Sequence, residues 1–214
     1  MKSIACGLLL AATSFVSCAD GLQSLENFVK SASSGRADFV QVVSSPARDG
    51  HAARSKTSSG SFQFLRPNRF RFDYKKPFPQ SIVADGQTLW LYDVDLNQVT
   101  ARPQSVALGS TPAALIAAAP DLRALQAEFT LATAPDSEGL RWLLATPRAR
   151  DGQLNAIRLG FRQGDQGTEL SVLDIQDNFG QRSVIRFANI EINPRLAEET
   201  FRFKPPKGAD VIRP

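Results

Sequence analysis

The sequence predicts a mainly β protein with helices, in the α+β class, built on a curved antiparallel sheet or open barrel of about ten or eleven strands. Three observations predict this fold. Short runs of alternating apolar and polar residues follow one another along most of the chain, which is typical of half-buried strands. Their connections are too short for the crossovers that parallel strands require. Two apolar segments, 21–32 and 109–119, have helical character, so helices could cover the concave side and enclose apolar volume.

The N-terminus has the pattern of a secretory signal peptide over residues 1–19. Lys2 is followed by a mostly apolar stretch over 4–16 and by the small residues of 17–19, in the order that signal peptides show. The apolar stretch is shorter than the roughly 20 residues of a membrane-spanning helix. We therefore expect cleavage after the signal, leaving a single domain over 20–214, a length common among all-β domains.

Both cysteines, Cys6 and Cys18, lie within the predicted signal peptide. The remaining domain then has no disulfide and no thiol nucleophile or ligand. An uncleaved anchor and a lipid attached to Cys18 are the alternatives, and the second would tether the protein to a membrane. Removal of Lys2 lowers the formal net charge from +4 to +3. This mild, dispersed charge favours contacts with anionic membranes or a partner protein, and predicts no nucleic-acid partner.

The first element after the signal is an amphipathic helix over 21–32, which Gly35 ends. Its apolar face consists of Leu22, Leu25, Val29 and Ala32, with Phe28 at the edge. This spacing is helical. A first strand over 37–44 follows, and residues 46–59 are expected to form a polar loop because they are rich in glycine, serine and charge.

The run over 60–92 places aromatic side chains at alternate positions of successive strands. The side chains that share a face are Phe62 and Phe64 in one strand and Phe70, Phe72 and Tyr74 in the next. Asp85 and Gly86 then mark a hairpin between two apolar strands. The strand over 89–92 is apolar on both faces, so we expect both faces to be covered.

A strand over 98–102 precedes an apolar helix over 109–119. Thr111 is a suitable N-cap for this helix, and Pro120 stops it. Because this helix is apolar on all sides, it must be buried or cover an apolar surface. The remaining predicted strands cover 128–134, 140–146, 154–161, 168–176, 182–192 and 201–203, with a helical turn over 194–199.

Residues with catalytic potential are scarce. His51 is the only histidine and lies in the polar loop, and Asp93 and Asp95 flank a turn beside Asn97, where such residues serve turn geometry. Without a second histidine or a cysteine there is no basis for a triad or a zinc site. The sequence therefore predicts no cofactor, no metal and no enzymatic activity; an exported hydrolase using His51 is the enzymatic alternative.

Arg66 is the charged residue that stands out in the aromatic run. It follows the alternation of Phe62 and Phe64, so it shares their apolar face, and it precedes Pro67, which favours an extended backbone. A guanidinium on an apolar face needs partners, because an unpaired buried charge is costly. Its donors could bind helix carbonyls or a polar ligand group. The alternative is a strand-end arginine that reaches solvent.

Several motifs in order resemble one known family. They are G-S-F-Q-F-L-R-P-N-R-F-R-F-D-Y, then P-x-x-Q-S-I-V-A-D-G-x-T-L-W-x-Y, L-G-S-T-P and a C-terminal F-R-F-K-P-P-K-G. Together they resemble the periplasmic outer-membrane lipoprotein carrier family, LolA, over essentially the whole domain. The resemblance implies an incomplete antiparallel β-barrel closed by helices over a hydrophobic cavity.

The resemblance also implies a function and a role for each matched residue. Acylated lipoproteins would be received from the inner-membrane ABC transporter LolCDE, carried through the periplasm by a monomer, and passed to the outer-membrane receptor LolB. Arg66 would be the latch that holds the lid helices of the empty protein, and Phe70 would grip acyl chains and keep transfer one-way. The side chains expected to line the cavity are Phe28, Phe39, Phe62, Phe64, Phe70, Phe72, Tyr74, Leu89, Leu91, and, in the lid, Leu115 and Ile116.

Two other readings remain open at this point. A receptor of the LolB type has a similar fold and is itself a lipoprotein, so acylation of Cys18 would favour it. A periplasmic binder of another apolar lipid would need the same cavity. Docking sites are not determined: Arg48, Arg54, Arg69 and Arg71 are candidates, although isolated surface charges commonly are only solvated.

Overall fold

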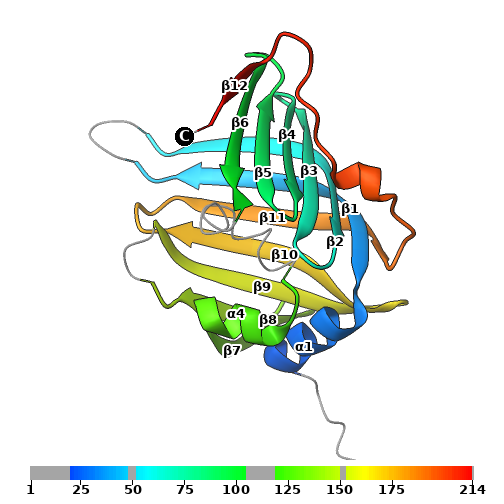
Figure 1. The fold of residues 1–214 in the computed structure, drawn as a ribbon. Helices are drawn as coiled ribbons and strands as arrows, with labels where there is room; N and C mark the ends of the chain where they lie inside the picture. The colour runs from blue at the N-terminus through cyan, green and yellow to red at the C-terminus, as the bar shows by residue number, and fades with distance from the viewer. Residues whose placement is uncertain (1–19, 48–51, 105–118, 150–152, 214) are drawn as a thin grey trace, which may run out of the picture.

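A computed structural model describes residues 20–47, 52–104, 119–149 and 153–213 of the chain. These residues form one twelve-stranded sheet with the order β12-β6-β5-β4-β3-β2-β1-β11-β10-β9-β8-β7. Figure 1 shows that the sheet curves, so that β3–β6 run across the direction of β8–β11. The predicted mainly β, open antiparallel architecture is confirmed, with twelve strands in place of ten or eleven.

The described part of the chain contains helices and strands in the following order. The helices are α1 (Gly21–Ser31), α4 (Leu122–Glu128) and the 3-10 turn η2 (Glu198–Phe201). The strands are β1 (Ser34–Ser45), β2 (Arg54–Leu65), β3 (Arg69–Lys76), β4 (Gln80–Asp85), β5 (Thr88–Asp93), β6 (Gln98–Pro103), β7 (Phe129–Ser137), β8 (Leu140–Pro147), β9 (Leu154–Gly164), β10 (Gly167–Asp177), β11 (Arg182–Ile192) and β12 (Asp210–Ile212). Neighbouring strands pair antiparallel, except that β12 is parallel to β6.

Helix α1 matches the predicted amphipathic helix to within a residue. The Asp20 carboxylate caps it by accepting a hydrogen bond from the Gln23 backbone N–H at 2.8 Å, as N-cap residues do. The helix packs across β7–β10 and buries Leu25 and Phe28. Gly21 is required at its start, because a Cβ there would lie 2.1 Å from the carbonyl oxygen of Trp142 in β8.

Two expected element boundaries are wrong. The polar loop expected over 46–59 is shorter, because β2 begins at Arg54 and pairs in register with β1 from Ser45 onward. Backbone pairing does not need apolar side chains, so the polar start of β2 gave no strand signal. The strand expected from residue 128 begins one residue later, after α4, whose N-cap Asp121 accepts from the Ala124 N–H at 2.8 Å.

The C-terminal segment corrects a further expectation. Residues 201–203 do not form a strand: Phe201 ends the 3-10 turn η2, and Phe203 lies in irregular structure. The Phe203 ring lies 5.5 Å from Trp90 and 5.9 Å from Tyr92, measured between ring centroids. It thereby covers the outer face of β5, while Leu89 is buried and Leu91 packs against the core on the inner face. Both faces of this strand are covered, as predicted.

The interior is built from two kinds of side chain. We use the name aromatic wall for the rings on β1–β3, namely Phe39, Phe62, Phe64, Phe70, Phe72 and Tyr74. We use the name aliphatic wall for buried residues of β8–β11, namely Leu143, Ile157, Leu159, Leu173 and Ile185. Both walls belong to one continuous hydrophobic cluster, to which α1 contributes Leu25, Phe28 and Val29.

Candidate functional site: an aromatic interior joined to helix α1 by Arg66

Arg66 lies directly after β2, at the end of the sheet that is nearest to α1. Its backbone N–H donates to the Ser33 carbonyl at 2.9 Å, which fixes the chain beside the end of the helix. The turn that follows is held by the buried side chain of Gln104, whose Nε2 donates to the Asn68 carbonyl at 2.7 Å. Local backbone contacts therefore aim the Arg66 side chain toward α1.

The guanidinium of Arg66 bonds to two backbone segments. Its Nε donates to the carbonyl of Ala32, the C-cap of α1, at 2.7 Å, and its Nη1 donates to the carbonyl of Ala119. Carbonyls at a helix C-terminus lack intrahelical partners and lie at the negative end of the helix dipole, so a cation is favoured there. Ala119 closes the predicted helix over 109–119. Arg66 thus joins β2 to α1 and to the end of the segment predicted as a lid.

Aromatic rings surround the same guanidinium. The Arg66 Cζ lies 5.3 Å from the ring centroids of both Phe28 and Phe64, a distance at which cation–π attraction is significant. Burial lowers the pKa of Arg66 to about 10, so the group stays charged at neutral pH. Its Nη2 is buried without a hydrogen-bond partner in the described part of the chain. Within the described residues, the guanidinium therefore makes hydrogen bonds through Nε and Nη1 and none through Nη2.

The structure brings together the predicted cavity residues that it describes. The buried members are Phe28, Phe39, Phe62, Phe64, Phe70, Phe72 and Leu89, and the partly buried ones are Tyr74 and Leu91. The rings form a contact network, with centroid distances of 4.3 Å for Phe62 and Phe72 and 5.5 Å for Phe39 and Phe72. Leu115 and Ile116 lie outside the described residues.

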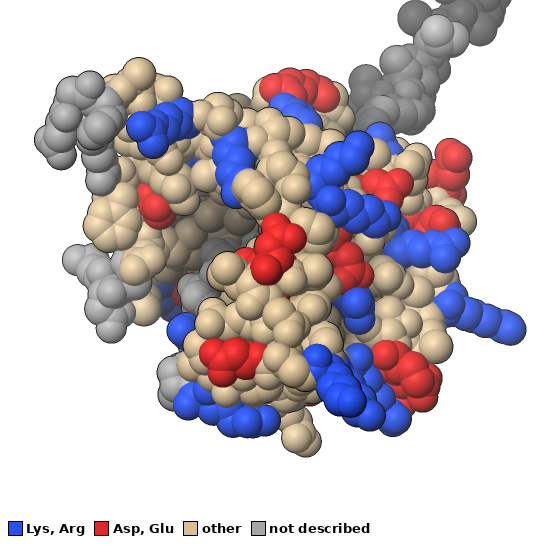
Figure 2. Space-filling model, turned by 90° about the horizontal axis from the view of Figure 1, so that it is seen from above, with Lys and Arg blue, Asp and Glu red and all other residues tan. Residues whose placement is uncertain are grey.

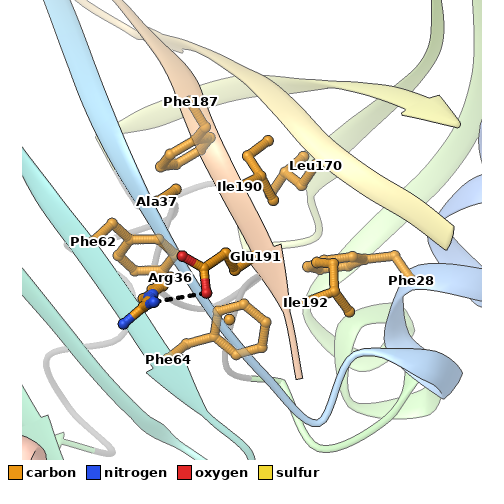
Figure 3. A pocket seen from close by; sticks show the side chains of 11 residues that line it. Phe28, Arg36, Ala37, Phe62, Phe64, Leu170, Phe187, Ile190, Glu191 and Ile192 are labelled. Atoms are coloured by element: carbon orange, nitrogen blue, oxygen red, sulfur yellow. Dashed lines mark ion pairs between the residues drawn. The ribbon is translucent and has the colours of Figure 1, made fainter. Parts of the chain in front are cut away.

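A recess of about 20 Å³ lies where the aromatic wall meets α1 and β11. Figure 3 shows Phe62 and Phe64 on one side of this space, and Phe28 beside Ile192 of β11 on the other. The Arg36 guanidinium and the Glu191 carboxylate pair at 2.8 Å across β1 and β11. The recess is almost wholly apolar in its lining, so it suits hydrocarbon and not a polar ligand.

Sequence reasoning missed the contribution of β11 and the tie at the end of α1. The alternation of apolar residues in β11 slips by one position between Phe187 and Ile190, and the structure has a register shift there between β1 and β11. That slip was a usable signal for a β-bulge. Asn193 accepts from the Ser33 N–H and donates to the Ser31 carbonyl, both at 2.8 Å; a lone asparagine after a strand carries no such signal.

Two of the arginines considered as docking residues hold the C-terminal segment instead of standing alone in solvent. Arg69 pairs with Glu198 at 3.4 Å, and Arg71 donates to Asp73 at 2.6 Å and to the Thr200 carbonyl at 3.3 Å. Arg54 is exposed. Arg48 lies outside the described residues.

Comparison with known proteins decides the family. Residues 30–204 match the family described as outer membrane lipoprotein carrier protein LolA. The chain belongs to this family. It is 66% identical over 206 residues to the outer-membrane lipoprotein carrier protein of Albidiferax ferrireducens, covering 96% of this chain and 97% of that protein. It is 52% identical over 195 residues to the protein of the same name from Leptothrix cholodnii, covering 91% and 86%. The predicted LolA resemblance is confirmed.

Solved structures agree with the fold of the LolA family. A LolA superfamily protein from Nitrosomonas europaea superposes with a TM-score of 0.50 and 11% identity, covering 87% of this chain and 99% of that chain. A DUF1329 family protein from Desulfovibrio piger gives a TM-score of 0.51 at 11% identity, covering 81% and 91%. At such low identity the likeness concerns the fold alone.

Asp93, one of the carboxylates considered in the sequence, ends β5. The Asp93 carboxylate accepts from the Leu96 N–H at 3.0 Å, so it stabilises the turn in which it lies. In the described part of the chain, no group of three or more His, Cys, Asp or Glu side chains could hold a metal. His51 lies outside that part. No helix among the described residues has the length and apolar character needed to cross a membrane.

Proposed function

We propose that this member of the LolA family is a periplasmic carrier that binds the acyl chains of lipoproteins released from the inner membrane and delivers them to an outer-membrane receptor. The observation that carries the proposal is the position of Arg66. One charged side chain ties α1 and the Ala119 carbonyl to an aromatic wall, so breaking two hydrogen bonds loosens the helical cover of an apolar interior.

The physical need for such a carrier lies in its cargo. Each methylene exposed to water costs ~0.8 kcal/mol, so one acyl chain carries on the order of 10 kcal/mol. A lipoprotein with several chains cannot cross an aqueous space alone. The carrier must also release its cargo, so the cover has to be weak by comparison. The two hydrogen bonds of Arg66, each with a net contribution of about 0.5–1.5 kcal/mol, can hold the cover closed and still be broken by an entering chain.

In this proposal Arg66 stabilises the closed, empty protein. An entering acyl chain displaces the cover and breaks the bonds to Ala32 and Ala119, and the aromatic wall then contacts the chain. Phe70 and Phe72, both buried in that wall, are placed to pack against methylenes. Reclosure of the latch favours the empty state and therefore release. No covalent step or cofactor is involved, and the protein is not an enzyme.

The proposed partners and location follow from the same role. Residues 1–19 are removed as a signal peptide, and the remaining domain acts as a monomer in the periplasm. It receives lipoproteins from the ABC transporter LolCDE and gives them to LolB. The relatives named as carrier proteins support this role over that of an acylated receptor.

The test is Arg66→Leu, which removes both hydrogen bonds and leaves an apolar side chain. We expect lipoprotein uptake from inner-membrane vesicles to persist while transfer to LolB falls about tenfold, because the empty state is no longer favoured by roughly 1–3 kcal/mol. Uptake is measured as lipoprotein released into the soluble fraction, and transfer as lipoprotein delivered to immobilised LolB.

Arg202→Leu is the matched control, because Arg202 is exposed and pairs only loosely with Glu199, at 3.9 Å. It should leave both steps unchanged. If Arg66→Leu changes neither uptake nor transfer, the latch is wrong. If the unaltered protein takes up no lipoprotein at all, the carrier role itself is wrong.

A further inference from the structure

The end of the sheet opposite Arg66 carries a cluster of exposed apolar side chains. Phe78 in the β3–β4 turn is 60% exposed, and Val94 and Leu96 in the β5–β6 turn are 42% and 71% exposed. The two turns lie side by side, since the Val94 N–H donates to the Pro79 carbonyl at 3.3 Å. We call Phe78, Val94 and Leu96 the apolar tip. In Figure 1 these turns lie at the top of the molecule, at the far end of β3 from α1.

Lysines flank the apolar tip. Lys75 and Lys76 are exposed immediately before the turn, and the Lys56 ammonium lies 4.7 Å from the centroid of the Phe78 ring. Asp93 and Asp95 are the carboxylates of the neighbouring turn, and Asp93 is engaged in capping it. Three lysines thus face two carboxylates around the tip, which leaves a small excess of positive charge toward anionic groups.

A recess connects the apolar tip with the aromatic wall. It has a volume of about 510 Å³, and its lining combines Phe78 and Leu96 of the tip and Tyr74 of the aromatic wall with polar and charged side chains, namely Gln41, Lys56, Ser58, Gln80, Asp93 and Asp95. The Tyr74 hydroxyl donates to Gln41 Oε1 at 2.9 Å, and its ring lies 5.0 Å from that of Phe39. Figure 2, viewed from above this end, shows that the surface is hollowed.

We propose that the apolar tip is a membrane-contact surface that inserts into the interface of an anionic phospholipid bilayer. Large apolar side chains beside lysines are the combination that binds such interfaces, through buried apolar area and attraction to anionic headgroups. Pro77 and Pro79 flank Phe78 and limit the backbone freedom that insertion would otherwise cost.

The lysines beside the apolar tip favour a bilayer over a protein as the occupant. A lipid interface supplies anionic headgroups for these lysines and hydrocarbon for Phe78, Val94 and Leu96. Three apolar side chains and a few lysines give weak and reversible attachment. This inference goes beyond the proposed function, because a carrier could exchange cargo with protein partners without touching lipid.

The experiment is vesicle flotation of the purified exported protein at low salt. Vesicles of phosphatidylethanolamine with phosphatidylglycerol are compared with vesicles of phosphatidylcholine. We expect binding to the anionic vesicles that weakens as salt is added. The double variant Phe78→Ser and Leu96→Ser should lower the partition coefficient about tenfold or more, because two apolar side chains no longer enter the interface.

Two further variants separate the apolar and electrostatic parts. Phe179→Ser is the matched control, since Phe179 is 53% exposed on the β10–β11 turn, and it should bind as the unaltered protein does. Lys75→Gln with Lys76→Gln should weaken binding to anionic vesicles by about tenfold and leave neutral vesicles unaffected. Urea unfolding midpoints verify that each variant is folded.

Two results overturn the proposal. One is an absence of binding of the unaltered protein to anionic vesicles at low salt. The other is equal binding by the unaltered protein and the Phe78 and Leu96 double variant. If no protein floats with vesicles but the double variant is impaired in cargo exchange with LolCDE or LolB, the tip contacts a protein partner and the membrane assignment is wrong. Neither result bears on the Arg66 latch, which is tested separately.

Discussion

The aromatic wall and the aliphatic wall enclose the same interior but are held in different ways. Helix α1 packs directly across β7–β10, so the aliphatic wall and the helix form a continuous packed unit. The aromatic wall reaches α1 through the bond from the Arg66 Nε to the Ala32 carbonyl at the helix end, and through the Phe28 ring, 5.9 Å from Phe64. One side is packed as a scaffold, and the other is attached by a few separable contacts.

This difference indicates how an apolar interior can be both stable and exchangeable. Branched aliphatic side chains interlock closely, and displacing them creates cavities that are costly. Aromatic rings present flat faces that can pack against one another or against methylenes. We therefore expect substitutions in the aliphatic wall to alter mainly the stability of the protein, and substitutions in the aromatic wall to alter mainly the retention of bound lipoprotein. Each of the following changes would break or sharpen that division.

The largest effect is expected from Leu159→Ala in the aliphatic wall. Leu159 is fully buried in β9, and a cavity there should lower the free energy of unfolding by about 2–5 kcal/mol. Urea unfolding followed by tryptophan fluorescence measures it. Lipoprotein bound per folded molecule should not change. A loss below about 1 kcal/mol, less than a buried Leu→Ala change ordinarily costs, would show that this wall is not the scaffold.

A smaller stability effect is expected from Phe72→Leu in the aromatic wall. The substitution keeps an apolar side chain and leaves only a small cavity, so it should lower the free energy of unfolding by about 1–2 kcal/mol, less than a change to alanine does. It removes the ring that contacts Phe39 and Phe62, so retention of bound lipoprotein during gel filtration should fall severalfold. Leu173→Ile in the aliphatic wall is the control, with a similar stability change and unaltered retention. Equal retention by both variants would erase the distinction between the walls.

The smallest effect is a pH dependence at Tyr74, where the aromatic wall meets solvent. Burial raises the pKa of Tyr74 from 10 to about 12. The folded protein keeps this proton where the unfolded chain releases it, so the contribution to stability is complete below pH 10 and is lost as the pH rises toward about 12. Tyrosinate absorbance in a Tyr92→Phe variant isolates Tyr74, because the chain contains two tyrosines. Titration near pH 10 would place Tyr74 in solvent.

Much of the fold was predictable because periodicity is a local property. The alternation through Phe70, Phe72 and Tyr74 predicted β3, and Asp85 with Gly86 predicted the hairpin that joins β4 to β5. The missed elements form because their backbone pairs with a neighbouring strand. The polar start of β2 pairs with β1, and β12 adds to β6 by parallel pairing of three residues, which no side-chain pattern announces.

The candidate site divides in the same way. The sequence by itself placed Arg66 on the apolar face of an aromatic strand, because alternation assigns every second side chain to one face. Its partners, the carbonyls of Ala32 and Ala119, were decided by the tertiary structure alone. Every residue carries a carbonyl, so no side chain identifies the ones that a distant guanidinium meets. Which turns come together to form the apolar tip was likewise decided by the pairing of β3 to β6, since contacts between separate turns depend on the fold and not on local sequence.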